Sequence, residues 1–294
     1  MFEEFKNAFS RYNNAHVQLI IINVVIFLVL AVVYVFSTVS GFESVFTLIH
    51  NQFLIPPKFI EFITRPWTLV TYGFAHSLPD IFHILFNMLA LYWFGKLFIE
   101  YLGNDKLIAV YVLGALAGGI VYLIMFNTIP FFQERSSFSG MVGASAAVYA
   151  VMVATATLLP NYTFFLLFLG PVRIKYIAFF YIVISFLGSV GPNAGGNLAH
   201  LGGALMGFIY VKQLQVGVNW GGWITATLDW IKGLFAPKPK VKVTYRKNQT
   251  EKKQPTFSKT TQEEIDAILD KISDRGYESL TKEEKEKLFN ASKK

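Results

Sequence analysis

Four polar side chains, Ser145, His200, His83 and Asn87, stand in apolar stretches of the chain and are of the types that acyl transfer requires. A serine hydroxyl is a weak nucleophile at neutral pH and needs a base beside it. Histidine is the side chain that most often takes such a proton and returns it. An asparagine and a second histidine can donate hydrogen bonds to the oxyanion that forms on an attacked carbonyl. The chemistry therefore depends on whether the fold brings these residues together.

The composition is that of a helical membrane protein. Of the 294 residues, 53% are hydrophobic and 15% are charged, whereas about a quarter are charged in soluble domains. A spanning helix needs roughly 20 mainly apolar residues. Because there is no cysteine, disulfides, thiolate catalysis and Cys-bound metals are excluded. Runs without any Asp, Glu, Lys or Arg cover residues 17–42, 107–133, 136–172 and 176–211.

These runs predict an all-α, polytopic membrane domain. The segment between the first two helices, 39–79, is rich in aromatic residues and is expected to lie in the membrane interface. The six predicted spanning helices are residues 17–38, 80–101, 105–127, 140–159, 172–189 and 195–213.

The distribution of Lys and Arg predicts the orientation, because these residues favour the cytoplasmic side. An even number of spans returns the chain to the side on which it starts, so both termini are expected in the cytoplasm. The predicted cytoplasmic side holds the basic C-terminal tail and Lys6, Arg11, Lys96, Lys106, Arg173 and Lys175. The opposite side holds only Lys58, Arg65 and Arg135.

The four polar side chains are expected at one depth. Ser145 and His200 each lie five residues into their predicted helices, and His83 and Asn87 lie three and seven residues into theirs. This places all four roughly 5–10 Å below the outer helix ends. A single buried serine usually serves helix packing, but ionisable groups inside a membrane are expensive and often functional. Three helices that deliver such groups to one level favour an active site.

The chemistry predicted for this level is a Ser–His dyad. His200 is the expected base for Ser145, and it would later return the proton to the leaving amine. No Asp or Glu lies between residues 134 and 229, so the buried acid of a triad is expected to be missing. The available oxyanion donors are His83, Asn87 and the backbone N–H of Ser145.

Small residues are concentrated around the serine and the histidine. Gly203 and Gly207 form a G-x-x-x-G pattern, which allows two helix backbones to approach closely. The same property holds for the residues beside Ser145. The small residues of the two helices are Gly143, Ala144, Ala146 and Ala147, and Gly202, Gly203 and Gly207.

The motifs resemble those of the rhomboid intramembrane serine proteases. The matching pieces are HILFNM at 83–88, GASA at 143–146 and AHLGGALMG at 199–207, in the expected order. The resemblance covers about residues 15–213. It implies a six-helix core with a Ser–His dyad on the fourth and sixth helices, an interfacial first loop, and water reaching the site from the outer side.

The resemblance also implies a role for each site residue. Ser145 is the implied nucleophile, His200 the base, and His83 and Asn87 the oxyanion donors. The implied substrates are single-span membrane proteins in a lipid bilayer, cut in or next to the span after a small residue. No cofactor, no metal and no nucleic acid is expected.

The sequence departs from the family pattern at one position. Where the usual pattern is G-x-S-G, Ala146 replaces the last glycine. The added methyl group could crowd the helix contact or narrow the substrate site, although the dyad is intact. His76, near the end of the first loop, is a further candidate for either a functional or a purely structural role.

The C-terminal part divides by composition. Three tryptophans with Lys232 predict an interfacial helix, and a Lys-, Arg- and Pro-rich stretch predicts a flexible basic linker. The capping box Thr281-x-x-Glu284 predicts a helical hairpin at the end, similar to extensions on some bacterial rhomboids, which could bind a partner protein. The predicted parts are an N-terminal segment 1–15, a membrane domain 16–213, an interfacial helix 214–236, a linker 237–260 and a hairpin 261–294.

Other functions fit these residues less well. A catalytically silent relative that binds membrane-protein clients would typically lack the Ser or the His, and this chain keeps both. A transporter would place charged or broken-helix sites at the midplane of the membrane. There is no H-E-x-x-H for a zinc protease and no intramembrane Asp pair for an aspartyl protease. The expected location is the inner membrane of a bacterium.

Overall fold

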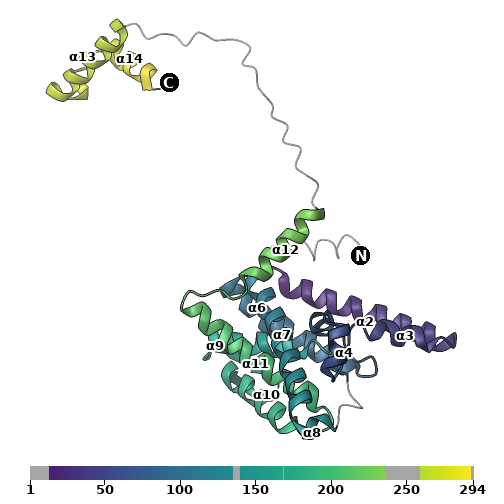
Figure 1. Cartoon of the computed structure of the whole chain (residues 1–294). Helices are drawn as coiled ribbons and strands as arrows, with labels where there is room; N and C mark the ends of the chain where they lie inside the picture. Colours follow the sequence, from purple (N-terminus) through teal and green to yellow (C-terminus); the bar gives the residue numbers. More distant parts are fainter. Residues whose placement is uncertain (1–12, 135–139, 168, 236–258, 293–294) are drawn as a thin grey trace. The chain divides into compact units, whose positions relative to one another are not determined.

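A computed structural model describes residues 13–134, 140–167, 169–235 and 259–292 (Figure 1). The chain separates into two compact units, Met1–Ala236 and Pro237–Lys294. The predicted segment 1–15 and the predicted linker 237–260 lie mostly outside the described residues.

The first unit is a bundle of helices, as predicted, and the all-α fold class is confirmed. Three of the described helices, α2, α6 and α7, are long and apolar enough to cross a membrane. Two others, α9 and α10, are apolar but shorter, with 14 and 15 residues. The predicted helices correspond to α2 (Ala15–Val39), α6 (Ile81–Leu102), α7 (Asn104–Thr128), α9 (Ser145–Leu158), α10 (Ile174–Gly188) and α11 (Ala194–Gln215).

Helix α9 is the centre of this bundle. It packs against α11, α7, α6 and α10, and α9 and α11 lie side by side (Figure 1). Eleven of its 14 residues are buried. A helix that is apolar on all sides needs neighbours on all sides, and alanines make up much of α9, so those neighbours approach closely. The serine of interest is therefore carried by the most enclosed helix of the described bundle.

The prediction that the fourth helix begins near residue 140 is wrong, because α9 begins at Ser145. Met141 instead forms an antiparallel bridge with Ile55, with both backbone N–H···O distances 2.9 Å. The N–H of Gly143 then donates to the carbonyl of Tyr72 at 3.1 Å. These bonds to the first loop hold the segment extended, so Ser145 lies at the N-terminal end of its helix and not five residues inside it.

The first loop is folded into short helices. Asn127 on α7 holds it, since Asn127 Oδ1 accepts from the N–H of Phe59 at 3.0 Å and Asn127 Nδ2 donates to the carbonyl of Pro57 at 2.9 Å. Arg65 Nη1 donates to the carbonyl of Asn51 at 2.8 Å within the loop. Its position in the membrane interface stays a prediction. The elements of the loop are α3 (Glu43–His50), α4 (Phe59–Thr64), α5 (Thr68–Thr71) and the 3-10 helix η1 (Tyr72–Phe74).

A small antiparallel hairpin between α9 and α10 was not predicted. It pairs Thr163 with Arg173 and Leu166 with Gly170, and Gly170 adopts φ +71°, which favours glycine. The remaining elements of the first unit are α8 (Pro130–Gln133), β1 (Thr163–Leu166), β2 (Gly170–Arg173) and α12 (Gly222–Phe235). Helix α12 exposes Trp223 and Trp230, as an interfacial helix would.

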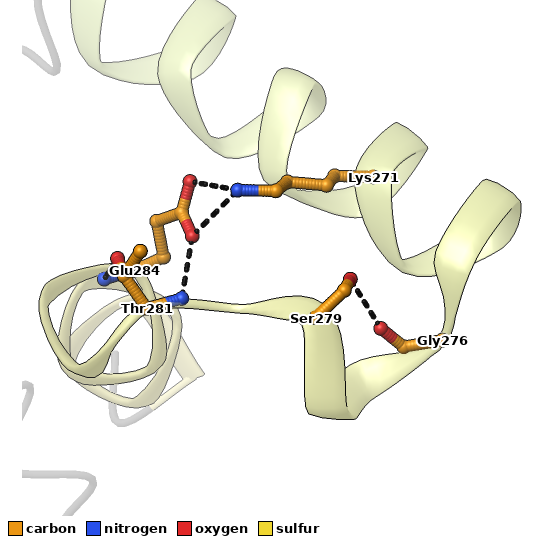
Figure 2. A network of polar contacts seen from close by, with 5 residues as sticks. All are labelled: Lys271, Gly276, Ser279, Thr281 and Glu284. Carbon is orange, nitrogen blue, oxygen red and sulfur yellow. Dashed lines mark hydrogen bonds and ion pairs between the residues drawn. The ribbon is translucent and has the colours of Figure 1, made fainter.

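The second unit contains the two helices expected at the C-terminus, α13 (Lys259–Arg275) and α14 (Lys282–Ser292), joined through the 3-10 helix η3 (Tyr277–Ser279). Gly276, with φ +75°, follows the end of α13. The N–H of Thr281 donates to Glu284 Oε2 at 2.7 Å, and the N–H of Glu284 donates to Thr281 Oγ1 at 3.3 Å, which is a capping box. Lys271 of α13 pairs with the same carboxylate at 2.9 Å, so one glutamate caps α14 and joins the two helices (Figure 2).

Candidate active site

The structure brings Ser145 and His200 into contact. Ser145 Oγ lies 2.7 Å from His200 Nε2, a short hydrogen bond between side chains of α9 and α11. Ser145 is 8% exposed. The N–H groups of the first turn of a helix have no acceptor within that helix, so the nucleophile candidate stands beside backbone donors.

The other ring nitrogen of His200 also has a partner. His200 Nδ1 lies 3.1 Å from Ser185 Oγ of α10, and Ser185 Oγ lies 2.9 Å from Tyr149 Oη of α9. The ring of Tyr149 stacks on the imidazole, with centroids 4.2 Å apart and planes inclined by 12°. The imidazole is thus held at both nitrogens and on one face.

Small residues permit this approach of α9 and α11. A Cβ added at Gly203 would meet the backbone of Ala146, with the carbonyl carbon 2.8 Å away. A Cβ added at Gly207 would meet the backbone of Ala150 one turn further along, with its Cα 2.9 Å away. The backbones of α9 and α11 therefore touch next to the two reactive side chains.

Gly143 leaves open the space between Ser145 and His83. Its φ of +146° disfavours other residues. A Cβ at this position would lie 3.5 Å from Ser145 Oγ and 3.9 Å from His83 Nε2. A group placed there, such as the oxygen of an attacked carbonyl, would be within reach of both side chains.

Asn87 takes a different position from His83. Its Nδ2 donates to the carbonyl of His83 at 2.9 Å, one turn back on α6. The N–H of His83 donates to Asp80 Oδ1 at 3.1 Å, which caps the helix. Asn87 is buried and is not among the described residues that line the cavity in front of Ser145. The structure thus places His83 on the cavity wall, while Asn87 bonds to the backbone of His83.

His76 is completely buried against His83. The two rings are 5.6 Å apart and nearly perpendicular, at 76°. Within the described part of the chain, neither nitrogen of His76 has a hydrogen-bond partner. Burial, and secondly the neighbouring His83, lowers the pKa of His76 to about 3, so this ring is neutral at physiological pH. Its contact with His83 is therefore one of ring packing.

A cavity of about 590 Å³ opens in front of Ser145. Its walls include Ser145, His83, the extended segment 140–142 and the loop 191–196. This volume is within the usual range for ligand sites, about 300–1,000 Å³. In the described ranges, no group of three or more His, Asp or Glu is placed to hold a metal ion.

Two residues of the site, Tyr149 and Ser185, were not predicted. Tyr149 carried a signal, since it follows Ser145 by four residues and therefore shares its helix face. There was a weaker signal for Ser185, which is a polar residue in the otherwise apolar run of α10. Its proximity to His200 depends on how α10 packs on α11.

Comparison with known proteins gives a family match for each unit. The family described as "Rhomboid domain" matches residues 64–215, which is more than half of the chain. A family of unknown function, DUF6576, matches residues 258–294.

Curated relatives match about half of the chain. RHOMBOID-like protein 12, mitochondrial, of Arabidopsis thaliana is 36% identical over 163 residues, which cover 52% of this chain and 48% of the relative. Rhomboid protein 1, mitochondrial, of Saccharomyces cerevisiae is 29% identical over 168 residues, covering 54% and 45%. Presenilin-associated rhomboid-like protein A, mitochondrial, of Danio rerio is 28% identical over 156 residues, covering 50% and 37%. The chain spans about half the length, or less, of these relatives.

Proposed function

The chain belongs to the rhomboid family, and from this premise we propose that it is an intramembrane serine endopeptidase that uses Ser145 and His200. The observation that carries the proposal is the 2.7 Å separation of Ser145 Oγ and His200 Nε2. A nucleophile and a base at this distance are what proton transfer during attack requires.

The proposed reaction proceeds in two halves. His200 Nε2 takes the proton of Ser145 as Oγ attacks the peptide carbonyl, and the imidazolium then gives this proton to the nitrogen of the leaving amine. The C–N bond breaks and an acyl-enzyme ester remains on Ser145. A water molecule, deprotonated by His200, attacks the ester and releases the carboxylate product, and the proton returns to Ser145.

The oxyanion is proposed to lie in the space beside Gly143. His83 Nε2 borders this space and is proposed as one donor. The backbone N–H of Ser145 is proposed as the second. Asn87, whose Nδ2 donates to the His83 carbonyl, is proposed to position His83. The cavity of about 590 Å³ would admit the water that the second half of the reaction needs.

The proposed substrates are single-span membrane proteins, cut in or next to the span. Helix α9 has 14 residues and is therefore about 21 Å long, while the hydrocarbon core is about 30 Å thick. If its C-terminal end reaches one boundary, Ser145 lies roughly 9 Å inside the other. A peptide bond at that depth has to come from a membrane segment with some tendency to unwind.

The proposed location is a cell membrane of bacterial type, with both termini in the cytoplasm. The lysine and arginine distribution supports the orientation, whereas the three relatives named above are mitochondrial proteins. Reporter fusions at each terminus, active only in the cytoplasm or only outside it, test the orientation. The C-terminal hairpin is proposed to bind a partner protein.

The test of catalysis is labelling of the purified chain by a fluorophosphonate probe, together with cleavage of a single-span substrate in liposomes. Both should be lost in Ser145→Ala and in His200→Ala. Ser189→Ala is the matched control, because Ser189 is half-buried just after the end of α10 and its hydroxyl donates to the carbonyl of Phe186. A folded wild type that neither labels nor cleaves would refute the proposal and favour a client-binding role.

A further inference from the structure

Ser185 is a fully buried hydroxyl that touches the base. It is 0% exposed and lies on α10, whereas Ser145 and Tyr149 lie on α9 and His200 on α11. Ser185 Oγ is within 3.1 Å of His200 Nδ1 and within 2.9 Å of Tyr149 Oη. Within the described residues, both hydrogen-bond partners of the His200 ring are therefore serine hydroxyls.

The number of protons decides the direction of these bonds. A neutral imidazole has one N–H and one unprotonated nitrogen, and a serine hydroxyl has a single proton to donate. If His200 takes the proton of Ser145 at Nε2, its own proton has to be at Nδ1. Ser185 then accepts from Nδ1–H, and its own proton can be donated to Tyr149 Oη, which lies 2.9 Å away.

The reverse arrangement is incompatible with a base at Nε2. If Ser185 donated to Nδ1, the imidazole proton would be at Nε2, and Nε2 could not accept from Ser145. Tyr149 Oη offers the Ser185 proton an acceptor away from Nδ1, while the tyrosine ring stacks on the imidazole at 4.2 Å. The stacking contact fixes the ring orientation, and the acceptor at Tyr149 Oη favours the tautomer with its proton at Nδ1.

We propose that Ser185, oriented by Tyr149, is a positioning residue that holds His200 as the Nδ1–H tautomer and retains this bond when the imidazolium forms. It takes the place that a carboxylate has in a triad, without bringing a charge into the bilayer. This inference rests on the proposed function, since it concerns the base of the same reaction.

The test compares kcat and KM for one single-span substrate across four variants. Ser185→Ala should lower kcat by about 10- to 100-fold, the value of a hydrogen bond to a charged group, with KM nearly unchanged. Ser185→Thr, which keeps the hydroxyl, should restore most of kcat. Tyr149→Phe keeps the stacking ring but frees the Ser185 proton, so it should also lower kcat. The double variant Ser185→Ala/Tyr149→Phe should be no slower than Ser185→Ala alone, because both changes act on one bond.

The outcomes separate this proposal from the proposed function. An active wild type together with unchanged kcat in Ser185→Ala or in Tyr149→Phe overturns the positioning role and leaves the protease intact. If Ser185→Thr has a kcat as low as Ser185→Ala, the positioning role is also overturned. A loss of kcat that the threonine hydroxyl does not restore would come from changed packing. An inactive, unlabelled wild type overturns both. Ser189→Ala, just after the end of α10, should keep wild-type kcat. If Ser185→Ala does not fold, the result for Tyr149→Phe decides.

Discussion

Replacing Gly203 with alanine tests whether the contact between α9 and α11 is what brings the base to the nucleophile. A Cβ at position 203 would lie 2.8 Å from the carbonyl carbon of Ala146 and 3.2 Å from its Cα, and closer still to its carbonyl oxygen. These are backbone atoms, so no side-chain rotation can relieve the contact. The two helices have to separate.

The size of the separation follows from ordinary contact distances. Carbon atoms in contact lie about 3.5–4.0 Å apart, so the helices would move by about 0.7–1.2 Å. Added to the present 2.7 Å between Ser145 Oγ and His200 Nε2, this gives about 3.4–3.9 Å, beyond the hydrogen-bond limit of about 3.2 Å. A misplacement of about 1 Å can cost on the order of 100-fold in rate, and overpacking costs about 1–3 kcal/mol of stability.

The assay is the rate of Ser145 labelling by a fluorophosphonate, measured beside thermal unfolding in detergent. Gly233→Ala is the matched control, since a Cβ at that position on α12 meets nothing within 4 Å. Adding Ala146→Gly to Gly203→Ala should not restore labelling, because the backbone contact remains. A Gly203→Ala protein with wild-type labelling and unfolding temperature would refute the reasoning.

Three further predictions concern other parts of the chain. His83→Ala should lower kcat by about 100- to 1,000-fold through loss of an oxyanion donor, while thermal unfolding is little changed; equal kcat would exclude the role. Ala146→Gly should cost about 1 kcal/mol of stability and leave Ser145 labelling near wild type, and a loss of labelling would show that the methyl group is required. The Thr281 N–H, and next Lys271, hold the pKa of Glu284 below its usual value. Its carboxylate therefore stabilises the hairpin above the unfolded pKa of about 4.3, and this contribution disappears as the pH falls through the lowered folded pKa. Hydrogen-exchange protection of α14 in the whole chain should decrease over that range in wild type but not in Glu284→Ala.

The presence of the long apolar helices could be predicted from the sequence, because it depends on composition over many residues. A run without charges, such as 17–42, has few alternatives to a helix in a bilayer, where each backbone N–H and C=O needs a partner within the segment. The residues at which the helices begin and end were harder to predict. The start of α9 depends on the bridge between Met141 and Ile55, which are far apart in the chain, and no local pattern around residue 140 indicates it.

Part of the candidate site could also be predicted from the sequence, and part of it could not. The four polar residues could be chosen from their types and motifs, but the bond from Asn87 to the backbone of His83, and the place of His83 on the cavity wall, could not. Ser185 was missed because a lone serine in an apolar helix is usually a packing residue. Only the approach of α10 to α11 shows that its hydroxyl reaches His200.

By itself, the sequence determined the class of structure and the chemical groups, because hydropathy and side-chain type are properties of each residue and its near neighbours. The tertiary structure decided where α9 begins, which hydroxyl holds the second nitrogen of His200 and how closely Gly203 lets two backbones approach. These features are distances between segments that are remote in the chain. They arise from the packing of the whole bundle, and proton transfer depends on them to within about an ångström.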